Sequence, residues 1–301
     1  MRALVIFPGA LGDLICLVPT LRAIGRRHRD CAIELMARGE LARFAVGRIG
    51  IAADHSIDRR EVTALFLDRA EPDRVACEFF GQFQAIYSFF AADDADFRRS
   101  LRAATRGAVS FHRFRPDGPG HISRLYLESL DALDEPVDSR IDLLPADFVN
   151  AERLLGQMDA ARGRFVLLFP GSGSATKNWP LDRFVDLARE TASLVKPIVV
   201  LGPAETGIAR HFREAQVETL EDLDLPTVAA LANLAGAFVG NDSGVSHLAA
   251  AAGCPGVVLF GPSDPARWHP LGDVTVVRRE PLETLPIAEV LNILGARLVS
   301  P

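Results

Sequence analysis

The chain has 301 residues, a mass of 32.6 kDa and a formal net charge of −6 at pH 7. This length predicts two domains, each able to bury its own core, and a content of 49% hydrophobic and 24% charged residues excludes a disordered, collagen-like or disulfide-rich chain. The negative charge argues against a general nucleic-acid-binding protein, because such proteins need a basic face to neutralise phosphates.

No apolar run approaches the ~20 residues of a membrane-spanning helix. The first run, Ala3–Phe7, ends too soon for a signal peptide, so we expect a strand of a mature cytoplasmic protein. The cysteines form no C-x-x-C pair and have no neighbouring His at zinc spacing, so we expect four buried thiols and no metal: Cys16, Cys31, Cys77 and Cys254.

Apolar patterning in the first half of the chain alternates between strand and helix periods. The predicted elements are a strand at 3–7, a helix at 14–26, a strand at 32–36, a helix from 39 to 46, strands at 85–90 and 108–111, and a helix at 121–133. This alternation predicts a buried parallel sheet. An extended, turn-rich stretch follows at 139–145, so we expect an N-terminal domain over 1–150 and a second domain over 151–301.

The second half repeats the alternation after a helix at 146–158. The predicted elements are strands at 165–169, 198–201, 237–240 and 257–260, helices at 181–194, 206–215, 225–234 and 246–252, and a final helix from about 286 that is a candidate to cross back onto the first domain. The fold class is therefore α/β, with two doubly wound, Rossmann-like parallel-sheet domains. Ligands in such sheets bind beyond the carboxyl ends of the strands, so the loops there are candidate sites.

The loop between the first strand and the first helix contains Gly9, Gly12 and Asp13. Glycines allow a tight turn, and the helix that follows presents free N–H groups to a polar ligand. The spacing is not a full G-x-G-x-x-G, which disfavours a Rossmann dehydrogenase. Asp13 has two interpretations that the spacing leaves open, a cap on its helix or a catalytic carboxylate.

The loop after the strand at 165–169 combines Ser172, Ser174 and Lys177 with small residues, a composition suited to binding phosphates. It lacks the Walker spacing, and a purely structural turn is the alternative. Lys177 is one of only two lysines among 33 basic residues, the other being Lys196.

A third loop, after the strand at 237–240, carries Asp242 and Ser243 at the start of a helix. Their side chains and the N–H groups from Gly244 onward are candidates to bind sugar hydroxyls or a diphosphate. His247 lies one turn inside this helix and is either a donor-binding residue or a satisfied core histidine. Ser243 does not fit a hydrolase nucleophile, because Asn241 stands where the G-x-S-x-G motif requires glycine.

A stretch from Arg98 to Arg115 contains six arginines and no acidic residue. It is either a solvated helix face or a surface that contacts an anionic acceptor or anionic lipid headgroups at the inner face of the cytoplasmic membrane. Arg98 and Arg102 are its candidate acceptor-side residues, together with Gly9 and Gly12.

Taken together, these motifs resemble the family 9 glycosyltransferases, which include the heptosyltransferases of lipopolysaccharide assembly. The resemblance covers 1–45 and nearly all of 160–270, and it rests on Gly9-x-x-Gly12-Asp13, Pro19 and Leu21, Pro170-Gly171-Ser172 with Lys177-x-Trp179-Pro180, Leu201-Gly202-Pro203-x-Glu205, Asn241-Asp242-Ser243-Gly244-x-x-His247, and Phe260-Gly261-Pro262-Ser263-Asp264-Pro265.

The resemblance implies a GT-B fold and inverting, metal-independent transfer from a nucleoside-diphosphate sugar, with ADP the expected nucleotide, to a saccharide or glycolipid acceptor. Asp13 would be the general base, a task that suits a carboxylate because it is ionised at neutral pH. Lys177, a serine at 172 or 174 and the N–H groups around Ser243 and Gly244 would stabilise the diphosphate. By the same resemblance, Glu205 would bind the nucleotide ribose and Asp242 the sugar hydroxyls. The domain over 1–150 would then be the acceptor-side domain, and the domain over 151–301 would bind the nucleotide sugar.

Two other classes of protein remain open. In a non-catalytic relative that binds nucleotide sugars, Asp13 would only cap its helix. A GT-B epimerase would act on the nucleotide sugar without an acceptor. Asp13 directly after Gly12 favours a transferase over both. The sequence does not identify the sugar, the acceptor or the oligomeric state.

Overall fold

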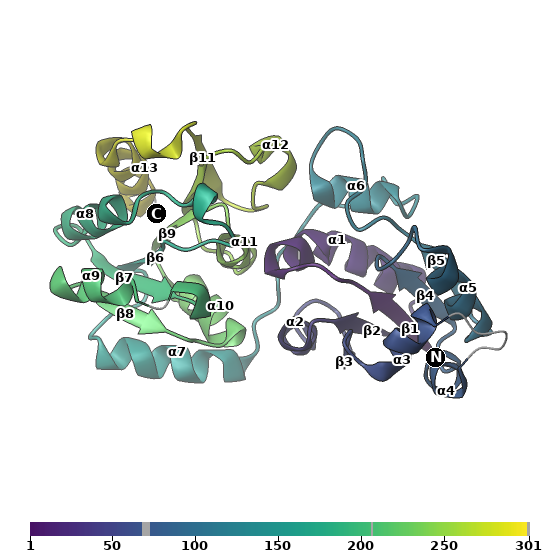
Figure 1. The fold of residues 1–301 in the computed structure, drawn as a ribbon. Coiled ribbons are helices and arrows are strands. Elements are labelled where there is room, and N and C mark those ends of the chain that lie inside the picture. The colour runs from purple at the N-terminus through teal and green to yellow at the C-terminus, as the bar shows by residue number, and fades with distance from the viewer. Residues whose placement is uncertain (68–72, 206, 300–301) are drawn as a thin grey trace. The chain divides into compact units, whose positions relative to one another are not determined.

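The protein consists of two compact units, Met1–Val137 and Asp138–Pro301, in a computed structural model that describes residues 1–67, 73–205 and 207–299 (Figure 1). The division falls before the boundary near 150 that the sequence suggests. Helix α7 (Pro145–Gln157) packs against α10 (Leu225–Leu234), so it belongs with the second unit.

The first unit is built on a parallel sheet with the strand order β3-β2-β1-β4-β5. Its strands are β1 (Arg2–Ile6), β2 (Ala32–Ala37), β3 (Ala53–Ser56), β4 (Ala85–Ser88) and β5 (Ala108–Phe111). Its helices are α1 (Leu11–Arg27), α2 (Gly39–Ala45), α3 (Arg60–Thr63), α4 (Arg74–Phe80), α5 (Ala95–Ala103) and α6 (Ile122–Glu128).

The core of this unit forms because β1 and β4 are almost entirely buried and their alternate side chains pack on opposite faces of the sheet. Leu4, Ile6 and Ile86 pack against apolar residues of α3, α4 and α5, including Phe80 and Phe97. Helix α1 packs against α6. A short loop joins the carboxyl end of β1, the central strand of the sheet, to the start of α1.

The second unit has a parallel sheet with the strand order β11-β10-β9-β6-β7-β8. Its strands are β6 (Phe165–Phe169), β7 (Lys196–Leu201), β8 (Glu218–Glu221), β9 (Ala237–Asn241), β10 (Gly256–Phe260) and β11 (Val274–Arg278). Its remaining helices are α8 (Leu181–Thr191), α9 (Ala209–Glu214), α11 (Gly244–Ala251), α12 (Pro265–Trp268) and α13 (Ile287–Val299).

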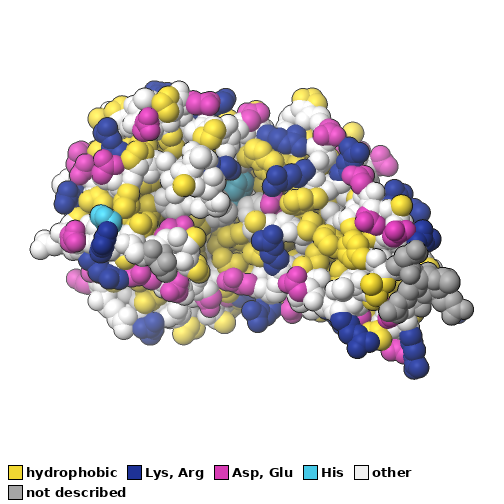
Figure 2. All heavy atoms as spheres, viewed as in Figure 1, with side chains coloured by type: hydrophobic (Ala, Val, Ile, Leu, Met, Phe, Trp, Pro, Cys, Tyr) yellow, Lys and Arg dark blue, Asp and Glu magenta, His cyan; other side chains and the backbone are white. Residues whose placement is uncertain are grey.

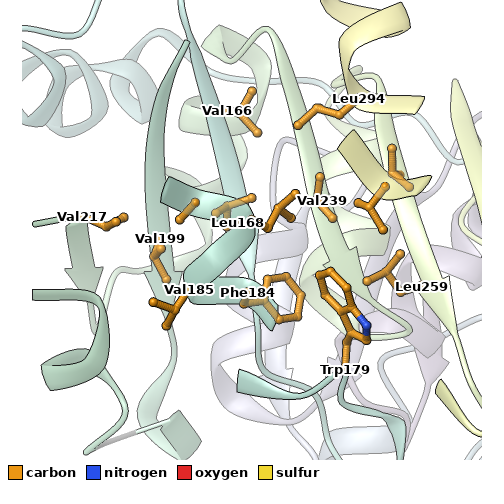
Figure 3. Packing of buried hydrophobic residues seen from close by; sticks show 14 of the residues in the cluster. Val166, Leu168, Trp179, Phe184, Val185, Val199, Val217, Val239, Leu259 and Leu294 are labelled. Atoms are coloured by element: carbon orange, nitrogen blue, oxygen red, sulfur yellow. The ribbon is translucent and has the colours of Figure 1, made fainter. Parts of the chain in front are cut away.

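One layer of the core of the second unit lies between its sheet and α8, α9 and α13. Figure 3 shows Val166, Leu168 and Val239 of the central strands facing this layer, with Trp179 beside Phe184. The two rings meet edge to face with centroids 5.3 Å apart. Helix α13 packs against α8, β9 and β10 of its own unit.

The sequence predicts both sheets but not all of their strands. The strands at 108–111 and 165–169 and the helix at 225–234 have the predicted bounds, whereas β3, β8 and β11 are not predicted. The predicted helix at 206–215 is observed from Ala209, and Thr206, its expected first residue, lies outside the described residues.

All four cysteines are free, but only Cys16 and Cys254 are buried, so the expectation of four buried thiols is wrong for Cys31 and Cys77. Burial raises the pKa of the Cys254 thiol to about 12. None of the helices in the described ranges combines the length and the apolar composition that a membrane span requires.

Candidate active site

In the second unit, three polar loops leave the carboxyl ends of the adjacent strands β7, β6 and β9. The loop after β6 runs from Pro170 to Pro180 and is here called the donor loop. Pro170 and Trp179 are buried near its two ends, whereas Gly173, Ala175 and Thr176 are exposed. The donor loop is therefore anchored at both ends and presents its middle to solvent.

The serines of the donor loop hold its local conformation. Ser172 Oγ donates to the Ser174 carbonyl at 2.7 Å and accepts from the Ser174 N–H at 3.2 Å. Ser174 Oγ lies 2.9 Å from Thr176 Oγ1. Three hydroxyl groups thus stand close together before Lys177, as the phosphate-binding interpretation expects, although each already has a partner within the loop.

Lys177 and Asp242 form an ion pair that joins the donor loop to the end of β9. Lys177 Nζ lies 2.7 Å from Asp242 Oδ2, and the Asp242 side chain is 6% exposed whereas that of Lys177 is 36% exposed. The buried carboxylate holds the ammonium group in place, while the Lys177 side chain stays partly exposed to solvent. Lys177 and Asp242, which the sequence analysis identified in separate loops, are therefore direct partners.

Glu205 joins the loop after β7 to the donor loop. Its Oε2 accepts a hydrogen bond from the Gly202 N–H at 2.8 Å. A Cβ atom on Gly171 would lie only 2.0 Å from Glu205 Oε1, so the carboxylate occupies space that Gly171 leaves open. The glycine in the donor loop is needed for this close approach.

Helix α11 begins where β9 ends, and its first N–H groups lack carbonyl partners within the helix. Ser243 is the residue before the helix, and its Oγ lies 3.2 Å from Ser246 Oγ. The N–H groups of Gly244 and Val245 therefore stand beside Asp242, at the positive end of the helix dipole. His247 is buried on the first turn, in agreement with the core interpretation, and donor contact by His247 remains an expectation.

In the first unit, Asp13 lies in the first turn of α1. Its Oδ2 accepts a hydrogen bond from the Ala10 N–H at 3.0 Å, so it performs the capping role that the sequence left open. A carboxylate has further acceptor sites, and this one hydrogen bond does not exclude a catalytic role. A Cβ atom on Gly9 would lie 2.7 Å from Asp13 Cβ, and Gly9 therefore allows this tight turn.

The predicted acceptor-side arginines of α5 stack on an aromatic ring. The guanidinium groups of Arg98 and Arg102 lie 5.1 and 5.2 Å from the centroid of Phe111. Arg99 pairs with Asp96 at 2.6 Å. In Figure 2, basic and acidic side chains are interspersed over the visible face of the first unit. Acidic residues from outside the stretch 98–115 therefore lie beside its arginines.

A cavity of about 490 Å³ lies at the carboxyl ends of β4 and β5, and the sequence did not single it out. Phe89 and Phe114 form its apolar walls, and its charged lining consists of Arg113, Arg115, Asp93, Asp94 and Asp117. Arg113 pairs with Asp117 at 2.8 Å, so the arginines of the cavity are balanced by carboxylates. Phe7 connects this cavity to the Asp13 turn, because its ring lies 5.9 Å from Phe89 and 5.5 Å from Phe114 between centroids. A Cβ on Gly9 would lie 2.4 Å from the same Phe7 ring.

The alternation of aromatic and basic residues around Arg113 and Arg115 is the feature of the sequence from which this cavity could have been predicted. No group of three or more His, Cys, Asp or Glu side chains in the described part of the chain is arranged to hold a metal ion. The candidate site thus consists of carboxylates, hydroxyls, one lysine and helix N–H groups.

Two doubly wound parallel sheets, each with polar loops at its carboxyl edge, define the GT-B class of fold. Comparison with solved structures agrees: the glycosyl transferase family 9 protein of Veillonella parvula has a TM-score of 0.81 at 17% identity, over 99% of this chain and 97% of that one. The ADP-heptose lipopolysaccharide heptosyltransferase II of Escherichia coli has a TM-score of 0.77 at 18% identity, over 99% of both chains.

The chain belongs to glycosyltransferase family 9 (heptosyltransferase), whose family model matches residues 95–294. It is also 31% identical over 145 residues to lipopolysaccharide heptosyltransferase 1 of Escherichia coli K12. That match covers 46% of this chain and 45% of the relative, so it spans a little less than half the length of the relative.

Proposed function

We propose that the chain is an inverting, metal-independent glycosyltransferase of cell-envelope glycan synthesis. It transfers a sugar from a nucleoside-diphosphate sugar, with ADP-heptose the expected donor, to a hydroxyl group of a saccharide or glycolipid acceptor. The names of the family 9 relatives support the donor and the lipopolysaccharide setting. The second unit would bind the donor, and Asp13 of the first unit would act on the acceptor.

The observation that carries this proposal is the Lys177–Asp242 pair beside the start of α11. When the bond between the anomeric carbon and the diphosphate oxygen breaks, negative charge develops on the leaving diphosphate. Lys177 and the N–H groups of Gly244 and Val245 are suited to stabilise that charge. Asp242 is suited to accept hydrogen bonds from sugar hydroxyls while it holds Lys177, and Glu205 to accept those of the ribose.

Asp13 is suited to accept the proton of the acceptor hydroxyl as its oxygen attacks the anomeric carbon from the face opposite the diphosphate. The products are then the glycoside with inverted configuration, the free nucleoside diphosphate and a protonated Asp13. The cavity beside Phe7, whose lining carries both arginines and aspartates, is the candidate position for a hydroxyl-rich part of the acceptor. Contact with the inner face of the cytoplasmic membrane would bring a lipid-linked acceptor to this unit.

Asp13→Asn separates catalysis from capping, because the asparagine Oδ1 atom can still accept the Ala10 N–H. We expect transfer to fall by about 10²-fold or more, the range for a lost general base, while the Kd for ADP stays within about threefold. The assay follows release of ADP from ADP-heptose in the presence of lipopolysaccharide core saccharides, with and without EDTA.

Calorimetry with ADP, UDP, GDP and CMP should precede that assay, and it should detect one nucleoside diphosphate whose binding is insensitive to EDTA. A normal turnover by Asp13→Asn would remove Asp13 as the base and leave only its capping role. If the folded protein binds none of these nucleotides, it is instead a family relative that has lost the ability to bind a nucleotide sugar.

A further inference from the structure

Asn241 is a completely buried polar residue at the end of β9, with a relative exposure of 0%. The other residues of this strand are alanine, phenylalanine, valine and glycine. Burial of a side-chain amide in such surroundings costs free energy unless its hydrogen bonds are made. Its partners therefore indicate what the residue stabilises.

Both polar atoms of the Asn241 amide bond to the donor loop, one at each buried end. Oδ1 accepts a hydrogen bond from the Trp179 N–H at 3.0 Å. Nδ2 donates to the Pro170 carbonyl at 2.8 Å. One side chain thus fixes the two ends of the loop that carries Ser172, Ser174 and Lys177.

The main chain of Asn241 also connects the end of β9 to α11 and to the Lys177–Asp242 ion pair. Its carbonyl accepts a hydrogen bond from Ser246 Oγ at 2.7 Å, and the next residue is Asp242, which holds Lys177. Gly240 makes room for this arrangement, because a Cβ there would lie 2.4 Å from Ser246 Oγ. Asn241 is therefore the common attachment point of the donor loop and the first turn of α11.

We infer that Asn241 is a positioning residue for the diphosphate of the nucleotide donor, an inference that rests on the proposed function. Asn241 does not touch the ligand. It fixes the distance between Lys177 on the donor loop and the N–H groups of Gly244 and Val245, so that both meet one diphosphate. Loss of either amide hydrogen bond releases one end of the loop and separates these two groups.

Asn241→Asp tests this inference with a side chain of the same shape. The carboxylate still accepts the Trp179 N–H but has no hydrogen to donate to the Pro170 carbonyl, so that end of the loop is released. It also adds a buried negative charge beside Asp242. We expect the Kd for ADP to rise about tenfold or more, which corresponds to about 1.4 kcal/mol, while the Kd for adenosine, which has no phosphate, changes less than threefold. Deuterium exchange of the peptide over 170–179 should accelerate.

Asn233→Asp is the matched control, because the Asn233 Nδ2 atom donates to the Ala252 carbonyl at 3.0 Å and bonds nowhere to the donor loop in the described structure. It removes the same kind of bond within the same unit and should leave the Kd for ADP within about twofold. Asn241→Ala, which removes both hydrogen bonds and adds no charge, is measured in the same comparison and should show the same selective loss of ADP affinity. A selective loss in Asn241→Asp alone would be charge repulsion and would overturn the inference.

An unchanged Kd for ADP, an equal loss for adenosine and ADP, or an equal loss in Asn233→Asp would overturn the inference in favour of a general structural role. If the unaltered protein binds no ADP, the proposed function fails. In that case the exchange rates of the peptide over 170–179 still decide whether Asn241 holds the loop.

Discussion

Gly171 shows how the absence of one side chain sets the position of a carboxylate. The Glu205 carboxylate occupies the space that a Cβ on Gly171 would fill, with 2.0 Å from that Cβ position to Oε1 and 2.6 Å to Cγ. Gly171→Ala should therefore displace Glu205 and break its hydrogen bond with the Gly202 N–H. We expect the Kd for ADP, measured by calorimetry, to rise about tenfold or more, because one hydrogen bond to a charged group contributes about 1.5–3 kcal/mol.

Gly173→Ala provides the matched control within the same loop, because a Cβ at Gly173 would meet no atom within 4 Å. Alanine there should leave nucleotide affinity unchanged and keep the melting temperature equal or slightly higher, since it restricts the unfolded chain. Equal effects of the two alanines on affinity would show that Glu205 does not contact the nucleotide.

At the scale of elements, the strands that the sequence failed to predict are all edge strands. β3 and β8 have the sequences Ala-Asp-His-Ser and Glu-Thr-Leu-Glu, without the apolar run that marks a strand buried on both faces. β11 lies at the opposite edge of the second sheet. Central strands such as β6 are predictable because helices cover both faces, and this forces every residue to be apolar.

The candidate site was predictable loop by loop but not as a connected arrangement. Small and hydroxylic residues after each strand indicated the donor loop and the start of α11. The contacts of Asn241 with Pro170 and Trp179, and of Glu205 with Gly171, depend on the strand order β9-β6-β7, which long-range pairing sets. Local sequence patterns do not contain that order.

Glu34 on β2 connects three adjacent strands of the first sheet and should make its stability depend on pH. Its carboxylate accepts from Arg2 of β1 at 2.8 Å and lies 2.7 Å from His55 Nε2 of β3. Burial acts to raise the pKa of Glu34, but the hydrogen bonds from Arg2 and His55 outweigh it and hold the pKa below the usual 4.5. The charged form is therefore favoured by folding. Its stabilising contribution is present above pH 4.5 and is lost as the pH falls through the lowered pKa.

Glu34→Gln should lower the free energy of unfolding at pH 7 by about 1.5–3 kcal/mol, the range for hydrogen bonds to a charged group. The difference from the unaltered protein should shrink as the pH falls below about 4.5, as urea unfolding at several pH values will test. Glu78→Gln removes the exposed pair with Arg74 and should lower the free energy of unfolding much less than Glu34→Gln does, because solvent screens this pair. A pH-independent loss in Glu34→Gln would mean that packing rather than charge explains it.

At the scale of the whole molecule, each unit has its own core and its own part of the proposed reaction. The buried cluster around Trp179 and Val239 contains residues of the second unit alone, and the cluster around Phe80 and Phe97 contains residues of the first alone. A ligand stabilises the part of a protein to which it binds, by about 2.7 kcal/mol at one hundred times its Kd. Nucleotide and acceptor should therefore slow amide hydrogen exchange in different parts of the chain.

Hydrogen–deuterium exchange of the full chain with saturating ADP should slow exchange in the peptides that contain 170–180, 202–205 and 241–247. Peptides that contain 8–13 and 113–117 should exchange as they do without ligand, because the proposed donor contacts all belong to the second unit. Acceptor saccharide alone should reverse this pattern. If ADP slowed both groups of peptides equally, the two units would respond to the nucleotide as one cooperative body, and the assignment of donor and acceptor to separate units would be wrong.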